Sequence, residues 1–215
     1  MSQRALVNAW EEAARAACLP LAYSEGKRPG PQISLAAPLP LGVTSDWELV
    51  DVHLAEWVPP EEALRCLATG LPKGVEAVDA CEVGVGAPSL QSQLRWAEYE
   101  VEVPADGVTA REVQEAIDGL LAADTLPAEY RREAKVRQYD LRPLVLDIRL
   151  EGERDGCLLL RMRLRAEPEL TARADQVLLA LGVPPARRIH RRRLYLQDSP
   201  PAVLAYRRRG EPEEG

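Results

Sequence analysis

The chain has 215 residues, of which 46% are hydrophobic and 28% charged, and its formal net charge is −7. This length suits one large domain or two small ones, and the apolar content is enough to build a core. No apolar run approaches the roughly 20 residues that a membrane-spanning helix needs, and the amphipathic N-terminus lacks the pattern of a signal peptide. We therefore expect a soluble cytoplasmic protein with no membrane contact.

The net charge conceals an asymmetry between the two halves of the chain. Residues 1–130 carry 8 basic and 21 acidic side chains, whereas residues 131–209 carry 19 basic and 10 acidic ones. Such a division indicates different partners for the two halves, or an attraction between them.

The first half is predicted to have the order α-β-β-α-β. Apolar residues recur at helical spacing over residues 3–18, and the sequence PPEEALRCLATG, ending at Gly70, has the prolines, early acids and terminal glycine of a second helix. The strands are predicted at residues 32–37, 47–54 and 75–83. A segment rich in proline and glycine, residues 20–42, joins the first helix to these strands.

The second half is predicted to have the order β-α-β-β-α-β. The strands fall at residues 98–103, 143–151, 156–165 and 188–196, and the helices follow Thr109 and span residues 173–181. Thr109 and Glu112 form a capping box at the start of the first of these helices. Residues 124–137 are interpreted as a connector, and GVGAPS, residues 84–89, as a linker.

The order β-α-β-β-α-β is typical of a ferredoxin-like, or split βαβ, unit. We therefore predict an α+β protein with two tandem ferredoxin-like units, the first lacking its N-terminal strand. The first unit would span residues 1–85 and the second residues 90–198, and residues 199–215 would form a flexible tail that is basic and then acidic.

The strongest signal for binding is the predicted hairpin of the second unit. Strict alternation places leucines and Met162 of residues 156–165 on one strand face and arginines on the other. On the partner strand, Leu144, Leu146, Ile148 and Leu150 are predicted to face the core. The predicted open face then carries these arginines: Arg149, Arg161, Arg163, Arg165, Arg191, Arg192 and Arg193.

Two interpretations of this basic face remain open. Arginines on an open sheet can bind the phosphates of RNA, although Tyr195 and Tyr206 are the only aromatic residues predicted near the basic strand. Alternatively, the arginines pair with Asp147, Glu151 and the acidic first half, which is the commoner role of a charge run.

The sequence contains no arrangement that predicts a catalytic, cofactor or metal site. The two histidines, His53 and His190, lie in different halves, and no two of the four cysteines lie within ten residues of each other. These spacings argue against a zinc ribbon or an iron–sulfur cluster. Asp140 and Asp147 remain as candidate carboxylates for an enzyme acting on RNA.

Several motifs, spread over most of the chain, resemble the radical SAM-linked protein family. The motif residues in LAYSEGKRPGPQISLAAPLPLG are Tyr23, Ser24, Glu25, Gly26, Pro29 and Pro31, and a second motif, YDLRPLVLDIRL, centres on Arg142 and Pro143. The resemblance implies a domain that occurs beside, or fused to, a B12-binding radical SAM protein. Lys27, Arg28 and Gly30 depart from the aromatic, Asn and His of the family pattern.

These observations lead to three functional hypotheses. The first is a non-catalytic accessory protein that works with a radical SAM enzyme and presents or docks a substrate, which could be RNA. The second is an RNA-modifying enzyme that uses the basic face and a carboxylate. The third is a degenerate paralogue kept for protein–protein interaction. The oligomeric state and the substrate stay open.

Overall fold

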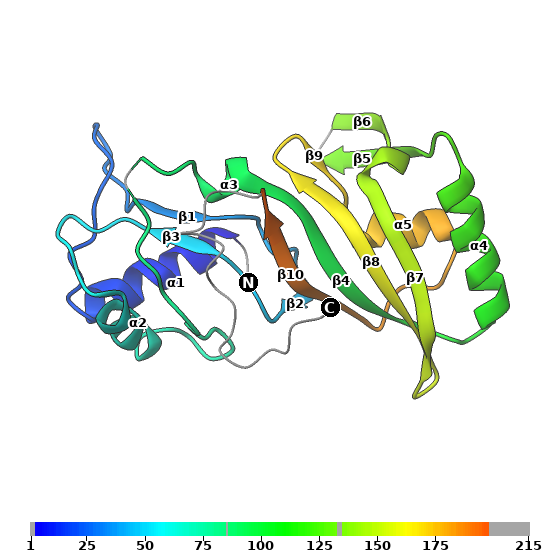
Figure 1. The fold of residues 1–215 in the computed structure, drawn as a ribbon, viewed down its shortest axis with the longest axis horizontal. Helices are drawn as coiled ribbons and strands as arrows, with labels where there is room; N and C mark the ends of the chain where they lie inside the picture. Colours follow the sequence, from blue (N-terminus) through cyan, green and yellow to red (C-terminus); the bar gives the residue numbers. More distant parts are fainter. Residues whose placement is uncertain (1–2, 85, 133–134, 198–215) are drawn as a thin grey trace, which may run out of the picture. The chain divides into compact units, whose positions relative to one another are not determined.

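The computed structural model describes residues 3–84, 86–132 and 135–197, and it has the mixed helix and sheet content of the predicted α+β class (Figure 1). The chain divides into two units. The first takes in the residues up to Pro38 and from Val50 to Gln93, and the second consists of Leu39–Leu49 and Leu94–Tyr195. The predicted tail, residues 199–215, lies outside the described residues. Within them, no helix is long and apolar enough to cross a membrane.

The first unit packs two helices against a short sheet. Helix α1 spans Gln3–Ala16, α2 spans Pro60–Ala68 and the single turn α3 spans Leu90–Gln93. Strands β1 (Ile33–Leu35) and β3 (Val50–Val52) pair in antiparallel fashion. The core contains Trp10, Ala13, Ala14, Leu21, Leu35 and Leu67.

The sheet of the first unit is smaller than predicted. Residues 75–83 do not form the predicted strand, although Val75 and Ala77 pack against the core, because no neighbouring strand pairs with their backbone. The described residues of this unit form a two-stranded sheet, and the ferredoxin-like arrangement predicted for the unit is not confirmed.

The second unit is built on a sheet with the strand order β2-β10-β4-β8-β7. Its long strands are β4 (Leu94–Pro104), β7 (Val145–Arg154), β8 (Cys157–Glu167) and β10 (Arg188–Leu196), and the two-residue strand β9 (Leu170–Thr171) pairs with β8. The order β10-β4-β8-β7 is the one that a β-α-β-β-α-β chain gives in a split βαβ unit.

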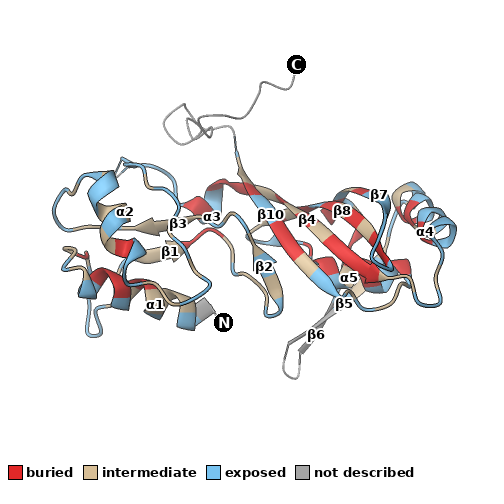
Figure 2. Ribbon diagram, turned by 90° about the horizontal axis from the view of Figure 1, so that it is seen from below, coloured by how far each residue is buried: buried red, intermediate tan, exposed pale blue. Residues whose placement is uncertain are grey.

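Helices α4 (Ala110–Ala122) and α5 (Ala174–Leu181) lie beside this sheet and bury their apolar stripes (Figure 1). The strand faces that these stripes cover are almost inaccessible: Val101, Val103, Leu158, Leu160, Met162 and Leu164 are each 0% exposed. Figure 2 shows the buried residues gathered along β4 and β8. The predicted capping box at Thr109 and Glu112 is present at the start of α4.

The prediction that Leu146 faces the core is wrong. Its side chain is 43% exposed, whereas Val145 is 2% exposed. The register of β7 against β8 shifts between Val145 and Asp147, so that Val145 takes the inward position. Such an irregularity changes which residue of a strand faces inward, and simple alternation does not reveal it.

Residues 124–137, predicted as a connector, contain most of a hairpin. Strands β5 (Pro127–Arg132) and β6 (Lys135–Asp140) pair with each other in antiparallel fashion. The short 3₁₀ turn η1 (Arg142–Leu144) then leads into β7.

A segment from the first half of the chain contributes the edge strand of the second sheet. Leu39–Leu49, which we call the strap, belongs to the second unit, although the segments on both sides of it belong to the first. Within the strap, β2 (Val43–Ser45) pairs in parallel with β10, so that Thr44 lies opposite His190. The sequence had placed these residues within the first unit, residues 1–85.

Candidate nucleic-acid interface

The sheet face opposite the helices of the second unit is a charged surface of both signs. Strand β4 places Glu98 opposite Arg163 of β8, and Glu100 opposite Arg161. Directly opposed residues on an antiparallel pair lie on the same face, so carboxylates and guanidinium groups are interleaved there. The face predicted as a file of arginines is therefore partly neutralised by β4.

Most arginines of the predicted basic face are ion-paired. Arg161 Nε lies 2.6 Å from a carboxylate oxygen of Glu151, and Arg161 Nη1 lies 3.7 Å from one of Glu98. The remaining pairs of this face are Arg149–Asp147 (2.9 Å), Arg165–Glu167 (2.7 Å), Arg192–Glu100 (3.5 Å) and Arg192–Asp46 (3.9 Å). These contacts agree with the interpretation that the face pairs with carboxylates, including Asp147 and Glu151.

Arg191 does not lie on the open face. It is only 2% exposed, and its Nε donates to a carboxylate oxygen of Glu48 in the strap at 2.8 Å. The Arg191 side chain is therefore buried, whereas the side chains of Arg192 and Arg193 that follow it are exposed. Its predicted place among the outward arginines is wrong.

Arg163 and Arg193 differ from the other arginines because each lies over an aromatic ring. The rings of Trp96 and Tyr195 are stacked, with centroids 3.5 Å apart and planes inclined by 9°. The guanidinium carbon of Arg163 lies 5.1 Å from the Trp96 centroid, and that of Arg193 lies 5.6 Å from the Tyr195 centroid. Arg193 also lies 5.9 Å from the centroid of Trp47 in the strap.

Four of these side chains form an aromatic–arginine row across the sheet: Arg163, Trp96, Tyr195 and Arg193. They come from β8, β4 and β10, which are neighbours in the sheet order, and Trp47 of the strap adjoins the Arg193 end of the row. Arg163 and Arg193 are both exposed. No carboxylate of the described residues forms an ion pair with either of them, so the uncompensated positive charge of this face is concentrated at the row.

Arg163, Arg193 and Tyr195 were identified from the sequence. Trp96 and the adjoining Trp47, which are far from the basic strand in the sequence, were missed. Trp96 could have been found, because it alternates with Glu98 and Glu100 on the outward side of β4. Trp47 carried no such signal, since its position depends on the pairing of β2 with β10. Tyr206 lies outside the described residues.

The motif residues of the proline-rich segment shape a hairpin in the first unit. Tyr23 bridges to Pro31, and the Ser24 amide donates to the carbonyl of Gly30 at 2.9 Å. The Tyr23 hydroxyl accepts a hydrogen bond from Arg15 of α1 at 3.1 Å. Between these ends, Glu25, Gly26 and Pro29 are exposed, and Gly26 has a φ of +127° that favours glycine.

The second motif has a structural role within the second unit. The Arg142 guanidinium donates to the carbonyls of Val145 and Leu121, each at 2.8 Å, which ties the end of α4 to the start of β7. Pro143 lies in the 3₁₀ turn between Arg142 and Leu144. These contacts give the motif a role in the fold of this unit.

The carboxylates considered for catalysis are engaged in similar contacts. Asp140 accepts hydrogen bonds from the backbone amides of Leu126 (2.7 Å) and Arg142 (3.0 Å). Asp147 pairs with Arg149. In the part of the chain that the structure describes, no three His, Cys, Asp or Glu residues are grouped so that they could hold a metal ion.

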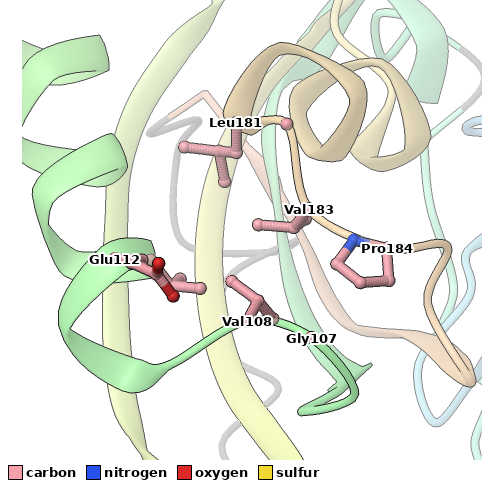
Figure 3. Close-up of a pocket in the computed structure, with 8 residues that line it drawn as sticks. Gly107, Val108, Glu112, Leu181, Val183 and Pro184 are labelled. Atoms are coloured by element: carbon pink, nitrogen blue, oxygen red, sulfur yellow. The ribbon is translucent and has the colours of Figure 1, made fainter.

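A pocket of about 470 Å³ lies between the start of α4 and the end of α5 (Figure 3). Val108, Leu181, Val183 and Pro184 are among the residues that line it. The carboxylate of Glu112 also lines it, but this group already accepts hydrogen bonds from the backbone and hydroxyl of Thr109. We therefore place the candidate interface on the sheet face rather than here.

Glu102 gives this unit a testable pH dependence. It is 8% exposed and accepts hydrogen bonds from Arg187, at 2.8 Å and 3.1 Å, and from Arg188. The hydrogen bond from Arg187, and then that from Arg188, holds the pKa of this carboxyl below its ordinary value. A depressed pKa contributes stability above the unfolded-state value, and this stability is lost as the pH falls through the folded-state value.

We expect the wild-type protein to lose stability on acidification below about pH 4, where carboxylates with lowered pKa values become protonated. Glu102→Gln should be less stable than the wild type at pH 7, and the difference should shrink towards pH 3. Denaturant unfolding followed by circular dichroism at both pH values measures this. If the difference in the free energy of unfolding between the two proteins is the same at pH 7 and pH 3, the lowered pKa of Glu102 is contradicted.

Comparison with known proteins places the chain in a family. Residues 1–173 match the family described as "Uncharacterized protein conserved in bacteria (DUF2344)". The chain belongs to this family. No curated protein matches the DUF2344 chain.

One solved structure shows a similar fold. A chain in the "Crystal Structure of a Cbf5-Nop10-Gar1 Complex" is 15% identical to the DUF2344 chain, with a TM-score of 0.51, and the match covers 90% of the DUF2344 chain. The match covers 45% of that chain, so the DUF2344 chain spans less than half of its length. At this level of identity the likeness concerns the fold alone.

Proposed function

We propose that the protein is a non-catalytic, cytoplasmic accessory protein that binds single-stranded RNA on the sheet face of its second unit and presents it to a radical SAM enzyme. The observation that supports the RNA part is the aromatic–arginine row, where two arginines of this face that form no ion pair within the described residues, Arg163 and Arg193, lie over stacked rings. The radical SAM part rests on the sequence resemblance alone.

The row has the chemistry that single-stranded RNA requires. A guanidinium group can donate two parallel hydrogen bonds to a phosphate, and its plane can also stack on a nucleobase. Arg163 and Arg193 are held over rings, which reduces the freedom that each would lose when it binds. Their exposed donors can therefore bind phosphates, while the guanidinium planes that cover the rings offer surfaces to unpaired bases.

The charge balance of the face favours a single strand over a duplex. A surface that binds double-stranded nucleic acid relies on many uncompensated cations against two phosphate backbones. Here carboxylates pair with Arg149, Arg161, Arg165 and Arg192, and the remaining exposed arginines of the face adjoin aromatic rings. Stacking platforms next to a few cations are typical of proteins that bind single strands.

Two further observations agree with an accessory role. Of the carboxylates considered for an RNA-modifying enzyme, Asp140 accepts hydrogen bonds from two backbone amides and Asp147 forms a surface ion pair with Arg149. The chain of similar fold is part of a complex named for Cbf5, Nop10 and Gar1, so this fold occurs in a multi-component assembly.

Replacing both arginines of the row should weaken RNA binding. We expect Arg163→Gln/Arg193→Gln to lower the affinity for a fluorescein-labelled, unstructured 12-nucleotide RNA by about tenfold or more, since each stacked contact contributes roughly 1–3 kcal/mol. The wild type should show a shallow salt dependence, with a slope near −1.4 for two neutralised phosphates at about −0.7 each. Fluorescence anisotropy titrations at several salt concentrations measure both quantities.

The matched control replaces two arginines of the same face that are ion-paired, Arg161→Gln/Arg165→Gln. This variant removes the same number of charges but leaves the row intact, so its affinity should change less than threefold. If the two double variants lose affinity equally, binding is diffuse electrostatic attraction and the row has no special role. If the wild type does not bind RNA even at low salt, the RNA proposal is wrong.

The partner proposal needs a separate test. We expect the protein to copurify with the radical SAM protein encoded nearest to its gene when the two are coexpressed and only one carries an affinity tag. Absence of an adjacent radical SAM gene, or failure to copurify at micromolar concentrations, would argue against the partnership and leave RNA binding unaffected.

A further inference from the structure

The strap has an unusual mode of attachment to the second unit. None of its residues, Leu39–Leu49, is buried, and Leu41 is 76% exposed. Its backbone pairs with β10 over only three residues, Val43–Ser45. An element with so little apolar burial is held chiefly by polar contacts and can be released more readily than a core strand.

The polar contacts of the strap converge on consecutive residues of β10. His190 accepts or donates at both ring nitrogens: Nδ1 lies 2.7 Å from the Thr44 hydroxyl and Nε2 lies 3.0 Å from an Asp46 carboxylate oxygen. The same Asp46 oxygen lies 3.9 Å from Arg192 Nε. The Ser45 hydroxyl donates to the carbonyl of Arg191 at 2.8 Å, and Glu48 binds the Arg191 guanidinium.

Two adjacent strap residues contact the outer face at the end of the aromatic–arginine row. Asp46 brings a carboxylate to His190 and Arg192, and Trp47 brings an aromatic ring within 5.9 Å of the Arg193 guanidinium. A nucleotide of bound RNA would bring the same two groups, an anionic phosphate and a planar ring, to the same side chains. The Asp46 side chain is 59% exposed, so a ligand can reach this position.

We propose that Asp46 and Trp47 act as an internal mimic of one nucleotide, so that the strap competes with RNA for the end of the aromatic–arginine row. This inference rests on the proposed function, because it concerns how binding at that same face is regulated. RNA that displaces Asp46 and Trp47 gains Arg192 and the surface of Arg193 that faces Trp47, while the strap stays attached through the ion pair of Glu48 with Arg191. The docked strap therefore lowers the affinity for RNA.

The test compares two double variants of the full-length protein. Asp46→Asn/Trp47→Ala removes the charge and ring of the mimic. Glu100→Gln/Trp57→Ala is its matched control, because Glu100 pairs with the same Arg192 and Trp57 is an exposed tryptophan of the first unit, with 69% of its surface accessible. The control thus removes one carboxylate and one indole without loosening the strap.

Two measurements are made on both variants and on the wild type. Anisotropy with the same labelled 12-nucleotide RNA should show that Asp46→Asn/Trp47→Ala binds about two- to fivefold more tightly than the control, because both variants remove a carboxylate from Arg192 but only this one also removes the ring that covers Arg193. Hydrogen exchange followed by mass spectrometry should show faster exchange over residues 39–49 in this variant than in the control. RNA added to the wild type should also accelerate exchange over those residues.

The possible outcomes separate this inference from the proposed function. If RNA binds the wild type but protects residues 39–49 from exchange, the strap is part of the binding site and the competition is refuted. If the two double variants bind with equal affinity, Asp46 and Trp47 are not competitors. If no protein binds RNA, the proposed function fails, and the strap inference fails with it whatever the exchange over residues 39–49 shows.

Discussion

Leu160→Ala is expected to lower the free energy of unfolding by about 2–5 kcal/mol, the range for a leucine truncated in a packed core. Leu160 is 0% exposed and lies in the middle of β8, where its side chain packs between the sheet and the helices α4 and α5. The truncation removes apolar contacts and leaves a cavity that the flanking β4 and β7 cannot close without losing their pairing. Urea unfolding followed by circular dichroism gives the value.

Leu179→Ala is the matched control, because it is the same chemical change at a residue of α5 that is 74% exposed. Surface substitutions of this kind stay within about 0.5 kcal/mol. If Leu160→Ala and Leu179→Ala lower the free energy of unfolding by the same small amount, then Leu160 does not lie in the core. The outward position of Arg161 and Arg163, on which the candidate interface depends, would then be wrong as well.

Glu48→Gln is expected to destabilise the protein by about 1.5–3 kcal/mol, the range for hydrogen bonds to charged groups. Arg191 is 2% exposed, and the Glu48 side chain that pairs with its guanidinium group is 29% exposed. Removal of the carboxylate charge weakens this pairing of a buried guanidinium that cannot lose its proton. Denaturant unfolding at pH 7 measures the change.

Asp147→Asn is the control for this prediction, because Asp147 pairs with Arg149 at the surface, where the Arg149 side chain is 72% exposed. Exposed pairs contribute at most about 1 kcal/mol. Replacing both partners of the buried pair, in Glu48→Met/Arg191→Met, should recover much of the loss, because it leaves no unpaired buried charge. If Glu48→Gln and Asp147→Asn lower the free energy of unfolding equally, then the Arg191 guanidinium is accessible to water.

The second unit was largely predictable because its signals are local. Alternation along β8 gave both faces of the strand correctly, and the Thr109–Glu112 capping box fixed the start of α4. The turn between β7 and β8 contains Asp155 and Gly156, both with positive φ, which is the backbone conformation that Asp and Gly residues in turns favour. Each of these features depends on residues that are close together in the sequence.

The features that the sequence did not reveal depend on contacts between distant residues. The strap joins the second sheet through pairing of Val43–Ser45 with β10, almost 150 residues away, and a three-residue strand has no pattern of its own. The inward position of Val145 follows from a register shift against β8. Residues 75–83 show the reverse case: they have strand-like alternation, but they are not paired into a sheet.

The sequence predicted the arginines of the candidate site, but it did not predict the carboxylates and aromatic rings that contact them. The alternation that placed Arg161 and Arg163 outward also places Glu98 and Glu100 outward on β4, and cross-strand pairing then neutralises part of the face. The sequence could not say which arginines would remain uncompensated. This required the register of β4, β8 and β10, which assigns Arg163 and Arg193 to the rings of Trp96 and Tyr195.

The central claim, that single-stranded RNA binds at the aromatic–arginine row, is tested most directly by photocrosslinking. RNA that contains 4-thiouridine is irradiated with the wild-type protein at low salt, and the crosslinked peptides are identified by mass spectrometry. We predict that crosslinks map to peptides containing Trp96, Tyr195 or Arg163 and that they disappear in Arg163→Gln/Arg193→Gln. Crosslinks confined to the first unit, or unchanged in that variant, would contradict the account.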